Sequence, residues 1–297
     1  MKGQLKTIYN LMPFKRELFS LIRSIGSPPY SIYKHLHFKG KIKIRIEDNY
    51  FLMRHYGYQI ENELFWGGLN DAWEKTSLSL WIKLCKISRC VFDIGANTGI
   101  YSLLAKCVNP NLSVFAFEPV PEMYKKLKLN CDLNRFEVKC IEIAVSDKDG
   151  TASIYLPETG EAYSVAVNKN LFNSGASVFE KKINTGRLFS FISKHGIPNV
   201  DLMKIDVESH EVEVLKGMGQ YLQQMKPTML IEILEDSLGE EIENLLADID
   251  YLYFNVNENN TLRLVEHIKK SDKYNYLIIR REIANDCDWL KTGILPA

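Results

Sequence analysis

Two short stretches of the chain hold residues whose types and spacing could do chemistry. In "FDIGANTG" (92–99), Asp93 stands directly before a turn that contains Gly95 and Gly99. In "KIDVESHE" (204–211), several carboxylates and a histidine follow an apolar run. A carboxylate at the end of a buried strand can bind a cationic group or take a proton from a hydroxyl. The two stretches therefore predict a site for a small ligand with a positively charged end.

The first stretch disfavours a phosphate-bearing dinucleotide. Such cofactors use a G-x-G-x-x-G turn, whose backbone approaches the pyrophosphate at a helix N-terminus. Here Asn97 stands in place of the second glycine, and the Asp93 carboxylate would repel phosphate. S-adenosylmethionine carries a sulfonium and an ammonium but no phosphate. We therefore expect Gly95 to let the backbone approach this cofactor and Asp93 to bind its ammonium, directly or through water.

Glu118 ends the next apolar run, "FAFEP", twenty-five residues after Asp93. An acid at this position can accept both ribose hydroxyls in dinucleotide and adenosylmethionine folds alike. Glu118 thus predicts a bound ribose, while the turn favours S-adenosylmethionine. A dinucleotide-dependent oxidoreductase is the alternative, and an acid before proline also caps helices.

The second stretch offers candidates for proton removal. An alcohol is a weak nucleophile, so a methyl acceptor needs a base or a metal. Asp206 is the first candidate for base or substrate orienter, Glu208 the second and His210 the third. The alternative is that the acids only complement the dipole of the following helix and that His210 is a solvated surface residue. A divalent ion shared by Asp206, Glu208 and Glu232 is a further alternative, not favoured, so no metal ligand is predicted.

The elements that must position these residues alternate between strand and helix. Short, continuously apolar runs between helical patterns indicate an α/β fold with a doubly wound, mostly parallel sheet covered on both faces. Between Gly150 and Gly196 the composition predicts a hairpin and a long loop that includes Tyr163 and Ser164, as in a lid or substrate loop. The predicted strands are "CVFDI" (90–94), "LSVFAFEP" (112–119), "EVKCIEIAV" (137–145), "VDLMKIDV" (200–207), "PTMLIEIL" (227–234), "YLYFNV" (251–256) and "YNYLIIR" (274–280).

The first part of the chain differs from the rest in charge. Residues 1–46 contain ten Lys and Arg against one acid, Glu17, whereas the remainder contains 27 basic and 36 acidic residues. Helical patterns are predicted up to about residue 40, followed by a half-exposed strand at 41–46. We expect a basic helical and strand extension at 1–69, a catalytic domain at 70–285 and a C-terminal tail at 286–297.

Composition excludes some partners. The net charge is zero and the body is acidic, so no nucleic-acid partner is expected. The six cysteines form no CxxC pair and several sit in apolar runs, which favours a reducing cytoplasm. No apolar run approaches the roughly 20 residues needed to span a bilayer. The basic residues 1–46 predict weak association with an anionic membrane surface, at its inner face; the alternative is a solvated amphipathic segment packed on the domain.

Several motifs together resemble the FkbM-type methyltransferases, a family within the Rossmann-like class I methyltransferases. The resemblance runs from about Leu64 to Ile279 and is carried by "VFDIGANTGIYSLLAK", "VFAFEPVPEMYKKLKLN", "IAVSDKDGTASIYLP", "LMKIDVESHEVEVLKGM" and "KPTMLIEI".

The resemblance implies a seven-stranded sheet whose last strand inserts antiparallel. It implies an S-adenosylmethionine-dependent O-methyltransferase acting on a hydroxyl of a small molecule or glycan, for example in surface polysaccharide biosynthesis. By similarity the methionine end lies along Asp93, Gly95, Asn97 and Gly99, the ribose at Glu118 and the adenine beside Ala144, Val145 and Ser146.

Two residues depart from the family pattern. Ser209 replaces the glycine of a "DVEGHE"-like motif, and a serine would be strained there if the backbone φ is positive. Phe189 in "RLFS" replaces an acid that commonly precedes this motif. These departures leave a non-catalytic Rossmann-like binding protein as an alternative function.

Overall fold

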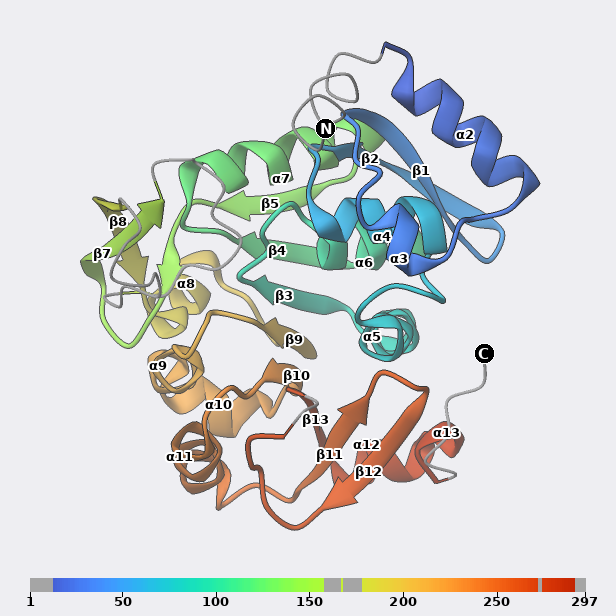
Figure 1. The fold of residues 1–297 in the computed structure, drawn as a ribbon. Helices are drawn as coiled ribbons and strands as arrows, with labels where there is room; N and C mark the ends of the chain where they lie inside the picture. Colours follow the sequence, from blue (N-terminus) through green and yellow to red (C-terminus); the bar gives the residue numbers. More distant parts are fainter. Residues whose placement is uncertain (1–12, 158–166, 168–177, 272–273, 292–297) are drawn as a thin grey trace. The chain divides into compact units, whose positions relative to one another are not determined.

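The computed structural model describes residues 13–157, 167, 178–271 and 274–291. The chain divides into two compact units, Met1–Trp73 and Glu74–Ala297 (Figure 1). The division falls near the boundary expected after residue 69. At the other end, two short helices run through 281–291, and the rest of the expected tail lies outside the described residues.

The first unit combines a β-hairpin with short helices. β1 (Gly40–Ile46) and β2 (Asn49–His55) are antiparallel, and Glu47 adopts a φ of 50° in their two-residue connection. The isoleucines of β1 are buried and its basic residues exposed, so the predicted strand at 41–46 is confirmed. The helices of this unit are α2 (Lys15–Ile25), α3 (Tyr30–Tyr33) and α4 (Gln59–Gly67).

An eight-stranded sheet forms the centre of the second unit. Its order is β12-β11-β13-β10-β9-β3-β4-β5, in which β10, β9, β3, β4 and β5 are parallel and β13 is antiparallel to both of its neighbours. The doubly wound, mostly parallel sheet and its antiparallel last strand are confirmed. The strands are β3 (Cys90–Ile94), β4 (Ser113–Phe117), β5 (Val138–Ile141), β9 (Leu202–Ile205), β10 (Thr228–Glu232), β11 (Tyr251–Asn257), β12 (Thr261–Val265) and β13 (Asn275–Arg280).

The eighth strand was not predicted. β12 pairs antiparallel with β11 at the edge of the sheet, after a turn in which Asn260 has a φ of 63°. In β12 only Leu262 is buried, because an edge strand next to a hairpin turn has little to cover it. Its apolar pattern is therefore too weak to mark a strand in the sequence.

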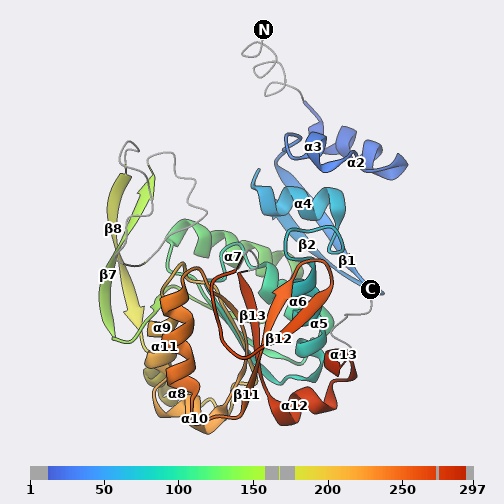
Figure 2. The same cartoon turned by 60° about the horizontal axis from the view of Figure 1, so that its bottom comes forward.

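Helices cover both faces of this sheet, as the continuously buried β3 requires. Phe92, Met203 and Met229 face α8–α11 and form one apolar cluster with them. Figure 2 shows α5 and α6 on the opposite side of the sheet. The helices are α5 (Lys75–Ile87), α6 (Ile100–Val108), α7 (Pro121–Asn134), α8 (Leu188–His195), α9 (Glu211–Met218), α10 (Gln220–Met225), α11 (Asp236–Leu246), α12 (Arg281–Asp286) and α13 (Asp288–Lys291).

A small second sheet contains the predicted hairpin. β7 (Gly150–Pro157) and β8 (Val178–Gly186) are antiparallel, and β6 (Ala144–Val145) pairs with the end of β8. The loop residues Tyr163 and Ser164 lie outside the described residues.

All six cysteines are free thiols, and five of them are buried. Among the described residues, no helix combines the length and the apolar character needed to cross a bilayer.

Candidate functional site

The carboxyl ends of β3 and β9 lie side by side where the strand order reverses. From β3 the chain continues outward through β4 and β5, and from β9 it continues in the other direction to β10. The Gly95 N–H donates to the carbonyl of Phe117 at 3.0 Å, and the Asp206 N–H donates to that of Ile94 at 3.1 Å. Open parallel sheets bind ligands at such a point. The structure therefore brings the two predicted stretches together.

The glycine turn needs its glycines for conformation and for space. Gly95 has a φ of +82°, and a Cβ there would lie 1.9 Å from the carbonyl oxygen of Asp206. Gly99 has a φ of +95°, and its Cβ would lie 2.6 Å from Leu127 Cδ1. Asn97 also adopts a positive φ, 50°, in the half-buried backbone between them. The turn packs so closely against the end of β9 and against α7 that both positions require glycine, whether or not a ligand is bound.

Asp93 is buried beneath this turn, with a side chain that is 1 % exposed. The Ser102 hydroxyl, in the first turn of α6, donates to Asp93 Oδ2 at 2.6 Å. Burial raises the pKa of Asp93 to about 6, although the bond from Ser102 and the charge of Lys204 oppose the shift. Sequence reasoning missed Ser102. It lies nine residues after Asp93, and only the path of the intervening turn brings the two side chains together.

Glu118 is also buried, and it holds the backbone of two loops. Its Oε2 accepts the Asn97 N–H and its Oε1 accepts the Val120 N–H, both at 2.8 Å. Burial raises its pKa to about 7, against the effect of these two bonds. A carboxylate has about four acceptor positions, so two remain for ribose hydroxyls. Val120 precedes the first turn of α7, so its bond to Glu118 does not cap that helix.

The predicted adenine segment is a buried strand end. Ala144 and Val145 form β6 and pair with Thr185 and Gly186 of β8. Ser146 Oγ lies 3.0 Å from His210 Nε2, so this segment contacts the predicted catalytic stretch.

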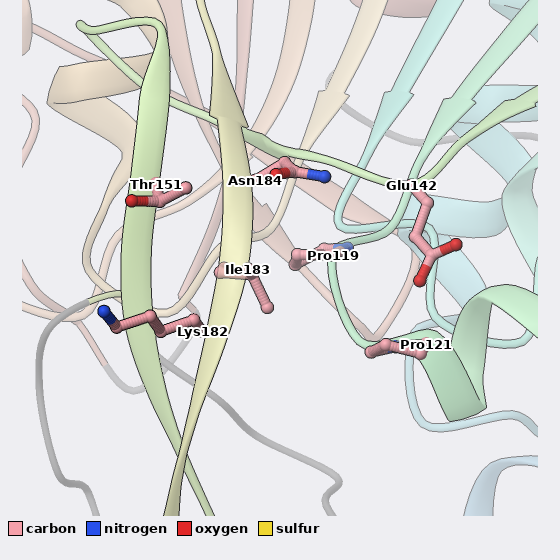
Figure 3. Close-up of a pocket in the computed structure, with 7 residues that line it drawn as sticks. All are labelled: Pro119, Pro121, Glu142, Thr151, Lys182, Ile183 and Asn184. Carbon is pink, nitrogen blue, oxygen red and sulfur yellow. The ribbon is translucent and has the colours of Figure 1, made fainter.

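A cavity of about 130 Å³ is lined by Pro119 and Pro121, which follow Glu118 in the chain, and by residues of β7 and β8. Figure 3 shows Ile183 of β8 facing Pro119 and Pro121, with Glu142 on the opposite side. Glu142 follows β5 and is exposed, so its carboxylate is available to an amino group of a ligand. Sequence reasoning did not identify Glu142, because it fell inside the single strand predicted at 137–145, which the structure divides into β5 and β6.

Lys204 is a fully buried cation below the site. Its ammonium lies 3.4 Å from Asp206 Oδ2 and donates to Asn275 Oδ1 at 3.4 Å. The Asn275 amide donates to Glu74 Oε1 at 2.6 Å, and the Tyr101 hydroxyl donates to Glu74 Oε2 at 2.8 Å. Burial lowers the pKa of Lys204, but the carboxylates of Asp206, Glu74 and Glu232 together raise it above its ordinary value. This chain of contacts links β9 to β13 and α6.

The turn after Asp206 is strained. Glu208 and Ser209 have φ values of 57° and 68°, in a region that side chains with a Cβ rarely adopt. The backbone φ of Ser209 is therefore positive, which is the condition under which a serine at this position is strained. The Val207 and Ser209 N–H groups donate to Glu211 Oε1, both at 3.3 Å, and Glu211 is fully buried. Burial raises the Glu211 pKa to about 7. His210 lies at the start of α9, with Nδ1 3.5 Å from Glu213 Oε2.

Three carboxylates meet beyond the strand ends. One oxygen from each of Asp206, Glu208 and Glu232 lies within 4.8 Å of the others. Burial, followed by the charge of Asp206, raises the pKa of Glu232 to about 9. The protonated form of Glu232 is therefore favoured relative to an ordinary glutamate, and in that form it can donate a hydrogen bond. The set has the chemistry of a divalent-ion site, but Lys204 already places an ammonium 3.4 Å from Asp206.

Phe189, the second departure from the family pattern, lies in α8. It packs against Tyr221, with ring centroids 5.4 Å apart, and the Arg187 guanidinium lies 5.1 Å from its ring centroid. Its contacts are those of a packing residue.

A doubly wound sheet with an antiparallel last strand, and acids gathered at its switch point, define a Rossmann-like enzyme of the methyltransferase class. The family model described as "Methyltransferase FkbM domain" matches residues 93–253. The chain belongs to the FkbM methyltransferase family. Membership favours the methyltransferase prediction over the oxidoreductase and the non-catalytic alternatives.

Three relatives are about a quarter to a third identical to this chain over the aligned residues. Methyltransferase sdnD of Sordaria araneosa is 30% identical over 53% of this chain and 71% of its own length. The 31-O-demethyl-FK506 methyltransferase FkbM of Streptomyces tacrolimicus is 32% identical over 43% and 58%. The hexuronic acid methyltransferase AglP of Haloferax volcanii is 26% identical over 59% and 68%.

Solved structures also match. A methyltransferase FkbM from Methylobacillus flagellatus KT has 16% identity and a TM-score of 0.40, over 64% of this chain and 43% of that one.

Proposed function

We propose that this protein is an S-adenosylmethionine-dependent O-methyltransferase that methylates a hydroxyl of a sugar or similar small molecule in the cytoplasm. The observation that carries the proposal is the gathering of buried acids at the switch point of the sheet. Asp206 raises the pKa of Asp93, Glu118, Glu211 and Glu232, although burial is the larger cause at each of them.

A cationic ligand suits this site. Carboxylates that are held close together in a poorly solvated place gain from a positive charge among them, and phosphates would be repelled. S-adenosylmethionine supplies an electrophilic methyl on a sulfonium when it is bound. The backbone of Gly95 and Asn97 would face it, with Asp93 near its ammonium and Glu118 accepting from its ribose. These residues fit the cofactor, because the buried acids Asp93, Glu118 and Glu211 outnumber the buried ammonium of Lys204 beside them.

Asp206 is the residue best placed to take the proton of the acceptor hydroxyl. Its side chain is 35% exposed and leads from the switch point toward solvent, while Asp93 and Glu118 are buried. Lys204 fixes its orientation from below. Because burial raises the pKa of Glu232, this residue is suited to donate a hydrogen bond to the same hydroxyl rather than to act as a base. Glu208 and His210 flank this position.

The class of acceptor is supported by the relatives. One is named for methylation at an oxygen of FK506 and another for methylation of hexuronic acid. Both are consistent with a hydroxyl acceptor, and the second supports a glycan.

The test is transfer of isotope-labelled methyl from S-adenosylmethionine to a panel of sugars, uronic acids and glycolipids. The Asp206→Asn variant is expected to lower turnover by about 10²–10⁴-fold, the usual contribution of a general base, with cofactor affinity nearly unchanged. Asp250→Asn is the matched control, because Asp250 pairs with Arg281 at the surface, 3.0 Å away. It should turn over like the wild type.

Absence of transfer to every acceptor, together with no binding of the cofactor by calorimetry, would refute the proposal. Cofactor binding combined with wild-type turnover in Asp206→Asn would remove Asp206 from the mechanism and leave the enzyme class intact.

A further inference from the structure

Two cysteines of the second unit meet between α7 and β5. Cys131 lies in the last turn of α7 and is 2% exposed, whereas Cys140 lies in β5 and is half-buried. The two thiols share a hydrogen bond. The Cys140 thiol also donates to the Val138 carbonyl at 3.7 Å. Two sulfurs are therefore in contact where a helix covers the edge strand of the sheet.

The path of the chain brings the two elements together. α7 ends at Asn134, and Arg135 adopts a left-handed φ of 56° directly after it. The Phe136 N–H then donates to the Cys131 carbonyl at 3.1 Å. This turn reverses the chain, so β5 packs against the helix that precedes it (Figure 1).

Strand alternation decides which way Cys140 points. The preceding residue, Lys139, lies on the sheet face of Phe115, with its ammonium 4.8 Å from the centroid of that ring. Phe115 belongs to the apolar cluster that faces α8–α11. Successive side chains of a strand point to opposite faces of a sheet. Cys140 therefore points to the other face, and there it meets Cys131 of α7.

The two thiols differ in reactivity. The hydrogen bond from Cys131 lowers the pKa of Cys140, against the effects of burial and of Asp132, and the charge of Lys128 lowers it further. The same hydrogen bond, followed by burial, raises the pKa of Cys131. The thiolate is the nucleophilic form of cysteine, so Cys140 is the thiol that reacts first.

Three other thiols of the chain are protected. Cys85, Cys90 and Cys107 are buried, and burial raises the pKa of each of them. Cys140 is only half-buried, so a small solute can reach its sulfur. A partly accessible thiol of lowered pKa beside a second thiol is the arrangement of cysteines that react with oxidants.

We propose that Cys131 and Cys140 form a site of oxidation by hydroperoxides, in which Cys140 is oxidised first and Cys131 then closes a disulfide. The Cys140 thiolate attacks one peroxide oxygen, the O–O bond breaks, and the departing oxygen takes a proton and leaves as water or an alcohol. Cys140 is then a sulfenic acid. The Cys131 sulfur attacks the Cys140 sulfur, the S–O bond breaks, and the hydroxyl leaves as water with the Cys131 proton.

With hydrogen peroxide, two thiols and one peroxide give one disulfide and two waters. The thiols lose two electrons, and the peroxide gains them. The sulfurs have to close from hydrogen-bond contact to about 2.05 Å, which is a small movement for side chains that already face each other.

Hydrogen peroxide treatment of the folded, full-length protein tests this. Remaining thiols are alkylated, the protein is digested without reductant, and mass spectrometry identifies linked peptides. We expect a bridge between Cys131 and Cys140 that is two hydrogen atoms lighter than the free thiols and that dithiothreitol removes. Cys140 should be oxidised about tenfold faster than Cys107, because more of it is thiolate.

Substitutions separate the two roles. In Cys131→Ala the second step is blocked, so Cys140 should accumulate as a sulfenic acid that dimedone captures. In Cys140→Ala the first step is blocked, so Cys131 should stay reduced. Cys107→Ala is the matched control, because it removes another buried thiol, on α6, and should form the bridge like the wild type. Thermal unfolding shows that the variants are folded, and Cys131→Ser takes the place of Cys131→Ala if that variant is not.

Failure of the folded wild type to form the bridge would overturn the proposal, as would a bridge that appears only in urea. Equal oxidation rates at Cys140 and Cys107 would also overturn it, and so would dimedone capture at Cys131 in Cys140→Ala. The result is independent of the proposed methyl transfer, since neither cofactor nor acceptor is present in the experiment.

Discussion

The ammonium of Lys204 lies 3.4 Å from Oδ2 of Asp206, and it is 1% exposed whereas Asp206 reaches toward solvent. This pair connects a buried hydrogen-bond network to the proposed site of methyl transfer. Tyr101, Glu74 and Asn275 hold Lys204 from the other side. The orientation of Asp206 is therefore determined by residues from four separate parts of the chain.

Replacing Lys204 by Met should destabilise the protein by about 3–5 kcal/mol, because the buried carboxylates lose their counter-ion. The loss should be smaller at about pH 5 than at about pH 8, since protonation of neighbouring acids removes the repulsion. Urea denaturation at both pH values measures this. Lys216→Met is the control, because Lys216 forms an exposed pair with Glu241 and should change stability little. Equal losses at the two pH values would contradict the electrostatic explanation.

Cofactor affinity should rise with pH. Burial raises the pKa of Asp93 to about 6 and that of Glu118 to about 7, and a cationic ligand favours the ionised forms. Between about pH 5 and pH 8, binding of S-adenosylmethionine should therefore tighten and release protons. Calorimetry in buffers of different ionisation enthalpy counts these protons. Glu118→Gln should release fewer, and an unchanged count would exclude Glu118 as their source.

The same two pKa values predict how stability changes without cofactor. When the pKa of an acid is higher in the folded chain than in the unfolded chain, the folded chain binds more protons at any pH between these two pKa values. The free energy of unfolding should therefore fall as pH rises from about 4.5 to about 7. Thermal unfolding across this range should show a decline that S-adenosylmethionine reverses at the upper end. A rise in stability over the same range would show that other groups dominate.

Gly95→Ala should destabilise the protein far more than the same substitution at another glycine with a positive φ. Gly196 also has a positive φ, +60°, but nothing lies within 4 Å of its missing Cβ. Gly196→Ala should cost about 1 kcal/mol from φ alone, whereas Gly95→Ala adds the contact with the Asp206 carbonyl at 1.9 Å. Denaturant unfolding and cofactor binding measure both variants. Similar losses in the two would mean that the strand ends can move apart.

Ser209→Gly should stabilise the protein by about 1–2 kcal/mol, since glycine adopts a φ of 68° without strain. Lys226→Gly is the comparison, because Lys226 has a φ of 48° and lies away from the site, after α10. Both gains can be measured by urea denaturation. If only Lys226→Gly stabilises, another contact of Ser209 offsets the strain.

Removal of divalent ions should leave turnover unchanged. The carboxylates of Asp206, Glu208 and Glu232 are close enough to bind an ion, but the ammonium of Lys204 already neutralises charge there and repels a second cation. Turnover with chelator and with added Mg²⁺ tests this, since both should match the untreated enzyme. Loss with chelator and recovery with Mg²⁺ would assign the three acids to a metal instead.

Much of the sheet could be predicted from the sequence, because each buried strand is a continuous apolar run that ends at a polar residue. β3 is buried along its whole length, and Asp93 and the glycine turn follow from that position. β12 could not be predicted in this way, since an edge strand contacts little besides its neighbour in the sheet. Glu74 and Asn275 were also missed, because they reach Lys204 from positions 130 and 71 residues away along the chain.

By itself, the sequence determined the α/β class, the acid-led turn and the family to which the motifs point, since strand length, apolar patterning and turn residues are local properties. Only the tertiary structure decided which acids share one site and why Gly95 must be glycine. Those features depend on the approach of segments that are distant in sequence. Burial and charge then act through space, and no local pattern records them.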